Sequence, residues 1–88
     1  MKLITLITAE VCIAELATVC SANDTILLRQ DAVYLARRTD IDWPCQQVMA
    51  LGSDVTVRQI APVKGIAIIN DAQWVQFAAT ASQVVLWR

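Results

Sequence analysis

Three cysteines are the residues of this chain that could perform covalent chemistry: Cys12, Cys20 and Cys45. A thiolate attacks other sulfur atoms, so an exposed thiol with a lowered pKa could carry sulfur as a persulfide or exchange disulfides. Cys20 ends an expected helix beside a polar turn, and Cys45 follows a Trp-Pro pair at the start of an expected strand. These positions make Cys20 and Cys45 the two candidate thiols.

Each cysteine also has a structural interpretation, because free cysteine is among the most buried residue types. Cys20 falls on the apolar stripe of its helix, and the negative end of a helix dipole raises the pKa of a thiol. Cys12 shares an apolar surface with Leu16 and Val19, so we expect it to be packed. Cys45 could be exposed, but no basic residue lies near it in the sequence. The sequence therefore assigns no catalytic residue.

The rest of the composition excludes most other chemistries. The chain has no histidine, which excludes histidine-based acid–base catalysis and histidine-ligated metals. An odd number of cysteines without a CxxC spacing argues against a disulfide scaffold or a zinc cluster, and it suits a reducing cytoplasm. Only two glycines are present, so there is no phosphate-binding loop, and a net charge of −1 offers no basic surface. We expect no metal, no cofactor and no direct contact with nucleic acid.

The first residues resemble a secretory signal, since Lys2 precedes an apolar run and small residues follow Cys20. Glu10 and Glu15, however, stand where that apolar run should continue. No apolar stretch approaches the length of a membrane span, which takes roughly 18 residues. We therefore expect a strand and a helix here, in a cytoplasmic protein without a membrane segment, and a signal peptide is the alternative.

Apolar periodicity predicts strands and helices in strict alternation. Near-continuous apolar runs, typical of strands covered on both faces, predict strands at residues 2–7, 25–28, 47–51, 66–69 and 84–87. Helical spacing predicts helices at 9–20, 31–38, 54–60 and 72–81. Such alternation forms a mostly parallel sheet. The sequence therefore predicts one α/β domain over residues 1–88, with a small doubly wound, mostly parallel five-stranded sheet and helices on both faces.

Polar residues at the expected helix starts have two interpretations. Asp31 follows the second strand at the carboxyl edge of the sheet, where α/β folds bind ligands. It could therefore contact a partner in an interface cleft, together with Gln30. Asp31 could also cap the helix that follows, and we favour this second interpretation. A capping role is expected as well of Thr8, Asp54, Asn70 and Asp71.

The chain is more apolar than 88 residues can easily hide, with 57% hydrophobic and 17% charged residues. Strands covered on both faces account for part of this excess. Trp74 lies on a helical stripe and is expected in the core, whereas Trp87 is harder to bury within one subunit and is the interface candidate. We expect the remaining apolar surface to form an obligate interface. Solvated or rim positions are expected for Arg29, Arg37, Arg38 and Arg58.

Three segments resemble the TusB/DsrH family, the smallest subunit type of the bacterial sulfur-relay complexes. Residues 24–36 (DTILLRQDAVYLA) are similar to that family's apolar strand, aspartate and short helix. Residues 47–55 (QVMALGSDV) resemble its third strand and polar turn, and residues 66–87 resemble its amphipathic helix and a closing strand that ends in tryptophan. Ala32 and Asn70 depart from the family pattern, which often has glycine and aspartate at these positions.

This resemblance implies a DsrE-like fold and a hetero-oligomer of three related small subunits, usually two copies of each. Such a complex accepts persulfide sulfur from a carrier protein and passes it on. The sulfur ends in 2-thiouridine at the tRNA wobble position in the Tus branch, and the Dsr branch serves sulfur oxidation. The principal active cysteine belongs to a larger subunit in this scheme.

We therefore expect a non-catalytic docking subunit of a sulfurtransferase complex that acts in tRNA thiolation. Its expected partners are two related small subunits in a hetero-hexamer, with sulfur-carrier proteins reached through the complex. In a first alternative, the chain itself carries persulfide on Cys20 or Cys45 in a Dsr-type sulfur-oxidation relay. In a second, it is a self-associating protein with a DsrE-like fold and another role.

Overall fold

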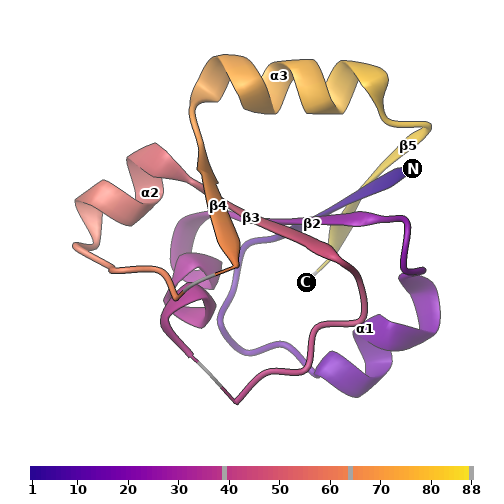
Figure 1. The fold of residues 1–88 in the computed structure, drawn as a ribbon, viewed down its shortest axis with the longest axis horizontal. Helices are drawn as coiled ribbons and strands as arrows, with labels where there is room; N and C mark the ends of the chain where they lie inside the picture. The colour runs from indigo at the N-terminus through magenta and orange to yellow at the C-terminus, as the bar shows by residue number, and fades with distance from the viewer. Residues whose placement is uncertain (39, 64, 88) are drawn as a thin grey trace.

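Strands and helices alternate along the chain in a computed structural model that describes residues 1–38, 40–63 and 65–87 (Figure 1). The strands are β1 (Lys2–Leu6), β2 (Thr25–Leu28), β3 (Gln47–Leu51), β4 (Ile66–Ile69) and β5 (Gln83–Trp87). The helices are α1 (Ile13–Val19), the 3-10 helix η1 (Gln30–Arg37), α2 (Gly52–Val57) and α3 (Asp71–Thr80). Each predicted strand is found within one residue of its expected position.

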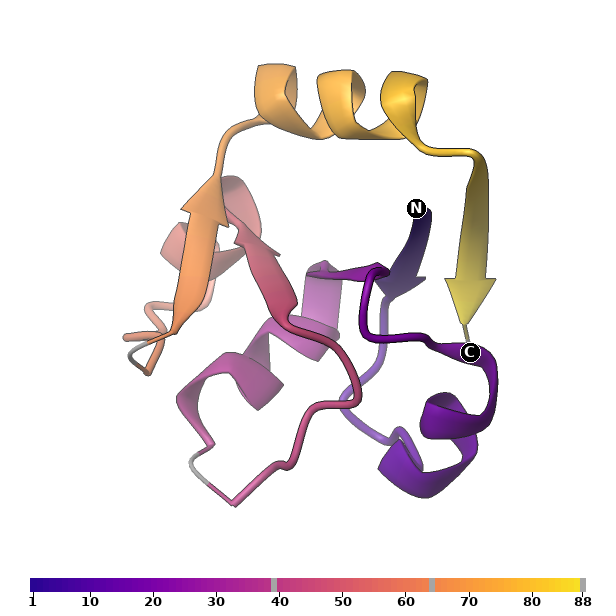
Figure 2. The same ribbon diagram turned by 45° about the vertical axis from the view of Figure 1, so that its right-hand side comes forward.

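All strand pairs are parallel, and the sheet order is β4-β3-β2-β1-β5. The first three connections each move one strand in the same direction, and the last returns across the whole sheet to the far side of β1. Because such connections are right-handed, this reversal sends α3 to the face opposite the other helices. Figure 2 shows α3 on one side of the sheet, with α1 and η1 on the other. The predicted doubly wound, parallel five-stranded fold is confirmed.

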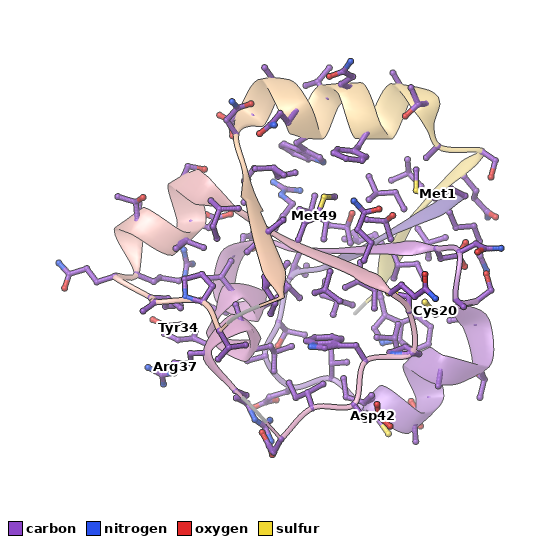
Figure 3. The ribbon with its side chains drawn as sticks, viewed as in Figure 1. Met1, Cys20, Tyr34, Arg37, Asp42 and Met49 are labelled. Atoms are coloured by element: carbon purple, nitrogen blue, oxygen red, sulfur yellow. The ribbon has the colours of Figure 1, made fainter. Side chains whose placement is uncertain are left out.

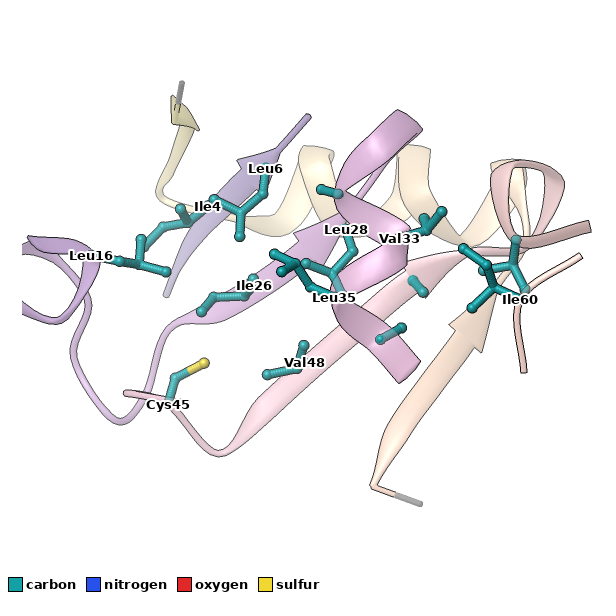
Figure 4. Packing of buried hydrophobic residues seen from close by; sticks show 14 of the residues in the cluster. Ile4, Leu6, Leu16, Ile26, Leu28, Val33, Leu35, Cys45, Val48 and Ile60 are labelled. Atoms are coloured by element: carbon teal, nitrogen blue, oxygen red, sulfur yellow. The ribbon is translucent and has the colours of Figure 1, made fainter. Parts of the chain in front are cut away.

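Two apolar clusters form the core, one on each face of the sheet. The larger lies under α1, η1 and α2 and includes Leu16 of α1 among side chains from the central strands (Figure 4). The smaller lies under α3 and consists of Leu3, Leu27, Met49, Leu51 and Ile69. Helix α3 has no fully buried residue and covers this cluster with partly buried Trp74 and Phe77. Since β1, β2 and β3 are buried on both faces, their near-continuous apolar sequence is explained.

The observed helix starts agree only in part with the capping residues that the sequence predicts. Asn70 caps α3, and its side chain forms a reciprocal capping box with Gln73, so the prediction for Asn70 is confirmed and that for Asp71 is wrong. Thr8 does not cap α1, because its hydroxyl accepts a hydrogen bond from the Glu10 amide within a turn. Helix α1 is therefore shorter than predicted.

Asp24 ties the start of β2 to the start of β1. Its two carboxylate oxygens accept hydrogen bonds from the amides of Lys2 (2.9 Å) and Ser21 (3.0 Å), and the Lys2 ammonium lies 3.6 Å away. Burial by itself would raise the pKa of the Asp24 carboxyl, but these hydrogen bonds and the Lys2 charge outweigh it. The pKa is therefore lowered from its ordinary 3.8.

This lowered pKa predicts an acid-sensitive stability. The folded state binds the proton less tightly than the unfolded chain, so the contribution of Asp24 is complete above the unfolded pKa and is lost as the pH falls through the folded pKa. We expect Asp24→Asn to unfold at lower urea concentration near pH 7 and to depend less on pH than the wild type between about pH 5 and pH 2. Urea unfolding across this range tests the prediction. Asp42→Asn, which alters an exposed carboxylate, is the control. Identical pH profiles for Asp24→Asn and wild type would contradict the prediction.

Candidate functional site

The structure brings Cys20 and Cys45 together, although the sequence offered them as separate candidates. The segments that carry them lie side by side, since the Gln46 amide donates a hydrogen bond to the Ala22 carbonyl oxygen (3.4 Å). Both side chains belong to the larger core cluster, and each is 8% exposed. Cys20 is labelled in Figure 3, near α1, and Cys45 is labelled in Figure 4, near the start of β3. The two side chains are close enough for Cys45 to raise the pKa of Cys20.

The surroundings of the Cys20 thiol favour its protonated form. Burial, then Cys45 and Asp24, raise the pKa of Cys20 to about 12, and the Lys2 charge opposes them only in part. The Cys20 thiol also donates to the Ser21 carbonyl oxygen (3.5 Å), and the Cys45 thiol donates to the Gln47 carbonyl oxygen (3.3 Å). Cys20, which is buried, protonated and already donating, is therefore a poor nucleophile at neutral pH, and the burial of Cys45 limits access to its thiol.

A cavity of about 380 Å³ lies beside Cys45 at the amino ends of β3 and β4. It is lined by Arg38, Ile41, Trp43, Cys45, Gln46, Val48, Val63, Gly65 and Ile66. The cationic side chain of Arg38 pairs with Asp40 (Nε to Oδ1, 2.9 Å), which partly neutralises its charge. Cys45 is among the lining residues of this cavity, and Cys20 is not.

Cys12 is exposed, so the prediction that it is packed is wrong. Because α1 begins at Ile13, Cys12 is the N-cap residue in an extended conformation and does not share the buried face of the helix. Leu16 is the one fully buried residue of α1. Among the described residues, no group of three cysteine or acidic side chains is arranged to hold a metal ion.

These environments predict the order in which the thiols react. The upward shift of the Cys20 pKa from 9.0 to about 12 leaves about 1,000-fold fewer thiolates at pH 8. We expect iodoacetamide to label Cys12 alone in the folded protein and all three cysteines in denaturant. Peptide mass spectrometry after timed labelling measures this order, and labelling of Cys20 as fast as Cys12 would contradict it.

Asp31 lies at the carboxyl edge of the sheet in a small charged network. Its carboxylate is exposed and accepts from the Arg58 guanidinium (3.1 Å), which also reaches Asp54 (3.5 Å). Asp54 in turn accepts from the Gln30 amide at the first residue of η1 (2.9 Å). The capping predictions for Asp31 and Asp54 are therefore wrong, because η1 and α2 follow Arg29 and Leu51 without side-chain caps.

Trp87 is half-buried against the larger core cluster, next to Val85 on the same face of β5. Strand β5 pairs with β1 alone among the described strands, so Trp87 stands on an edge strand. The fold thus covers part of Trp87 within one chain, and its role at an interface stays a prediction.

Sequence reasoning missed the pairing of Arg29 with Trp74. The Arg29 guanidinium carbon lies 3.9 Å from the centre of the Trp74 ring, a cation–π geometry. Arg29 was expected in solvent, but it follows β2 and crosses to the α3 face, where it is half-buried. No local pattern predicts this contact, since the two residues are distant in sequence and meet only through the return of α3.

Comparisons with known proteins agree with this architecture. A family model described as DsrH-like protein matches residues 9–84. The solution NMR structure of protein Tm0979 from Thermotoga maritima is similar to the chain with a TM-score of 0.67 and 20% sequence identity, over 90% of this chain and 92% of that one. At this identity the likeness shows the fold. No curated protein sequence matches the chain.

Proposed function

The chain belongs to the DsrH-like family of sulfur-relay subunits, and from this premise we propose that it is a structural docking subunit of a hetero-oligomeric sulfurtransferase complex. The observation that carries the proposal is the state of its thiols. Cys20 is buried and has a pKa of about 12, and Cys45 is buried and donates to a backbone oxygen. A subunit whose two core thiols are buried and already donate hydrogen bonds contributes to the relay by positioning other subunits.

We expect the partners to be two related small subunits, with the thiol that receives persulfide on one of them. The sulfur is proposed to pass toward 2-thiolation of the tRNA wobble uridine. A net charge of −1 supports the view that other proteins contact the tRNA. Deleting the gene and measuring 2-thiouridine in bulk tRNA by mass spectrometry tests whether the sulfur is used for tRNA thiolation. Loss of 2-thiouridine supports it, whereas unchanged tRNA with impaired sulfur oxidation contradicts it.

A second candidate function, persulfide carriage by Cys45, is favoured by the cavity beside that residue. The thiol would attack a donor persulfide through this opening. It would accept the terminal sulfur and release the donor as a thiol, so that atoms and charge balance.

The two functions are separated by a variant in which all three cysteines are replaced, Cys12→Ser with Cys20→Ala and Cys45→Ala. For the docking role we expect the complex rebuilt with this variant to transfer sulfur within about twofold of the wild-type rate. Cys12→Ser alone is the control, and circular dichroism checks that each variant is folded. Lost transfer in an intact complex, with a wild-type chain that gains one sulfur atom in mass, would contradict the docking role.

A further inference from the structure

The face of the sheet under α3 is incompletely covered. Within the described part of the chain, one helix spans this face, whereas three helical segments cover the other. On β5, Val84 and Leu86 are 52% and 48% exposed, and Val75 of α3 is 65% exposed. Strand β5 is also an edge strand, because β1 is its one partner among the described residues. An apolar surface beside an open strand edge is typical of a protein–protein contact.

These side chains line one groove of about 390 Å³ between α3 and β5. Its lining consists of Thr5, Arg29, Trp74, Val75, Ala78, Val84 and Leu86. Five of these seven residues are apolar, and Arg29 is the charged one. The groove therefore combines an apolar surface with a single cation.

Arg29 indicates what the groove binds. Its guanidinium stacks on Trp74 at 3.9 Å, which holds its position. Its Nε is buried, and no acceptor lies within hydrogen-bond distance among the described residues. The ion pairs of the described acidic side chains are made with Lys2, Arg38 and Arg58, and none is made with Arg29. A buried donor without an acceptor is costly, and a carboxylate matches a guanidinium best.

We propose that this groove is the surface through which the chain docks onto a partner subunit, and that the partner inserts an apolar segment bearing a carboxylate that pairs with Arg29. The inference rests on the proposed docking function and adds to it a location and a partner chemistry. The apolar part of the segment covers Val75, Val84 and Leu86. Its acidic side chain fixes the register of the two subunits, because an Arg–carboxylate pair is directional.

The test measures binding to the two related sulfur-relay subunits from the same genome by titration calorimetry. Leu86→Glu and Val75→Glu place a charge in the apolar groove, and each is expected to weaken binding about tenfold or more. Val57→Glu is the matched control, since Val57 is 76% exposed on α2, outside the groove, and its variant is expected to bind within about twofold of wild type. Arg29→Gln is expected to weaken binding and to reduce its salt dependence, and Arg29→Lys to restore it in part.

Circular dichroism and thermal unfolding establish that each variant is folded. Hydrogen exchange on the wild-type complex gives a second measurement, in which amides of β5 and α3 are expected to exchange more slowly than in the free chain.

Selective loss of binding in the groove variants, with slower exchange in β5, supports the proposal. Equal binding by wild type, control and groove variants would contradict the assignment of the groove as the docking surface, while leaving the docking function in place. Failure of the wild type to bind either subunit would overturn both. Self-association that Leu86→Glu abolishes, without binding to the related subunits, would identify a second copy as the occupant and overturn the proposed partner.

Discussion

Leu27→Ala is expected to lower the free energy of unfolding by about 3–5 kcal/mol. Leu27 is fully buried on β2, the middle strand of the sheet, and it packs on the face covered by α3. Truncating it removes apolar contacts and leaves a cavity that the rigid strands on either side cannot close. The loss is a large share of the stability of an 88-residue domain, which is about 4–13 kcal/mol.

Urea unfolding followed by circular dichroism measures this effect. Val57→Ala is the control, because its exposed side chain is expected to change stability by no more than about 0.5 kcal/mol. A Leu27→Ala variant as stable as Val57→Ala would show that the α3 face is not a packed core.

Leu16→Ala is expected to lower the free energy of unfolding by about 2–4 kcal/mol and to make the Cys20 thiol more accessible to labelling. Leu16 is the one fully buried residue of α1, and Figure 4 shows it beside Ile4. The Leu16 carbonyl oxygen also accepts the Cys20 amide hydrogen bond (3.1 Å), so the helix that Leu16 anchors holds Cys20 in place. Without this anchor, α1 opens locally more often than the rest of the fold.

The measurement is the rate of iodoacetamide labelling at Cys20 under native conditions, with labelling at Cys12 as the internal standard. We expect Cys20 labelling to accelerate by at least about tenfold in Leu16→Ala while Cys12 labelling is unchanged. An unchanged Cys20 rate in a destabilised variant would mean that α1 does not protect this thiol.

The strands could be predicted from the sequence because their signal is local. A strand buried on both faces must be apolar at nearly every position, and β2, β3 and β4 have the predicted bounds. Helix starts were less predictable, because several residues in a row could cap a helix and the tertiary fold selects among them. Residues 9–12 fit a helical pattern, yet α1 begins at Ile13, where Leu16 comes to face the sheet. The error at Cys12 follows directly from this boundary.

Long-range contacts could not be predicted from local pattern. The Cys20–Cys45 pair depends on the neighbouring positions of β2 and β3, and the Arg29–Trp74 stack depends on the return of α3 across the sheet. Asp54 hydrogen-bonds the start of η1 for a related reason, since α2 and η1 lie on the same face. The two residues of each pair lie far apart along the chain, so the sequence identified the individual residues and did not predict the contacts between them.

The structure places the many apolar residues of the sequence in two kinds of position, the buried strands and an exposed groove. Strands β1, β2 and β3, which are buried on both faces, contain ten of the twenty buried apolar residues in the described part of the chain. Three of the seven exposed large apolar side chains in the described part of the chain, Val75, Val84 and Leu86, line one groove around Arg29 on the α3 face. Trp87, the interface candidate from the sequence, stands on the opposite face of the same edge strand.

The central claim, that this chain is a docking subunit, is tested most directly by native mass spectrometry after co-expression with the two related sulfur-relay subunits from the same genome. We predict one assembly that contains all three chains, and an isolated chain that aggregates or associates with itself because its apolar groove is uncovered. A monodisperse monomer that stays free in the presence of both subunits would contradict the claim.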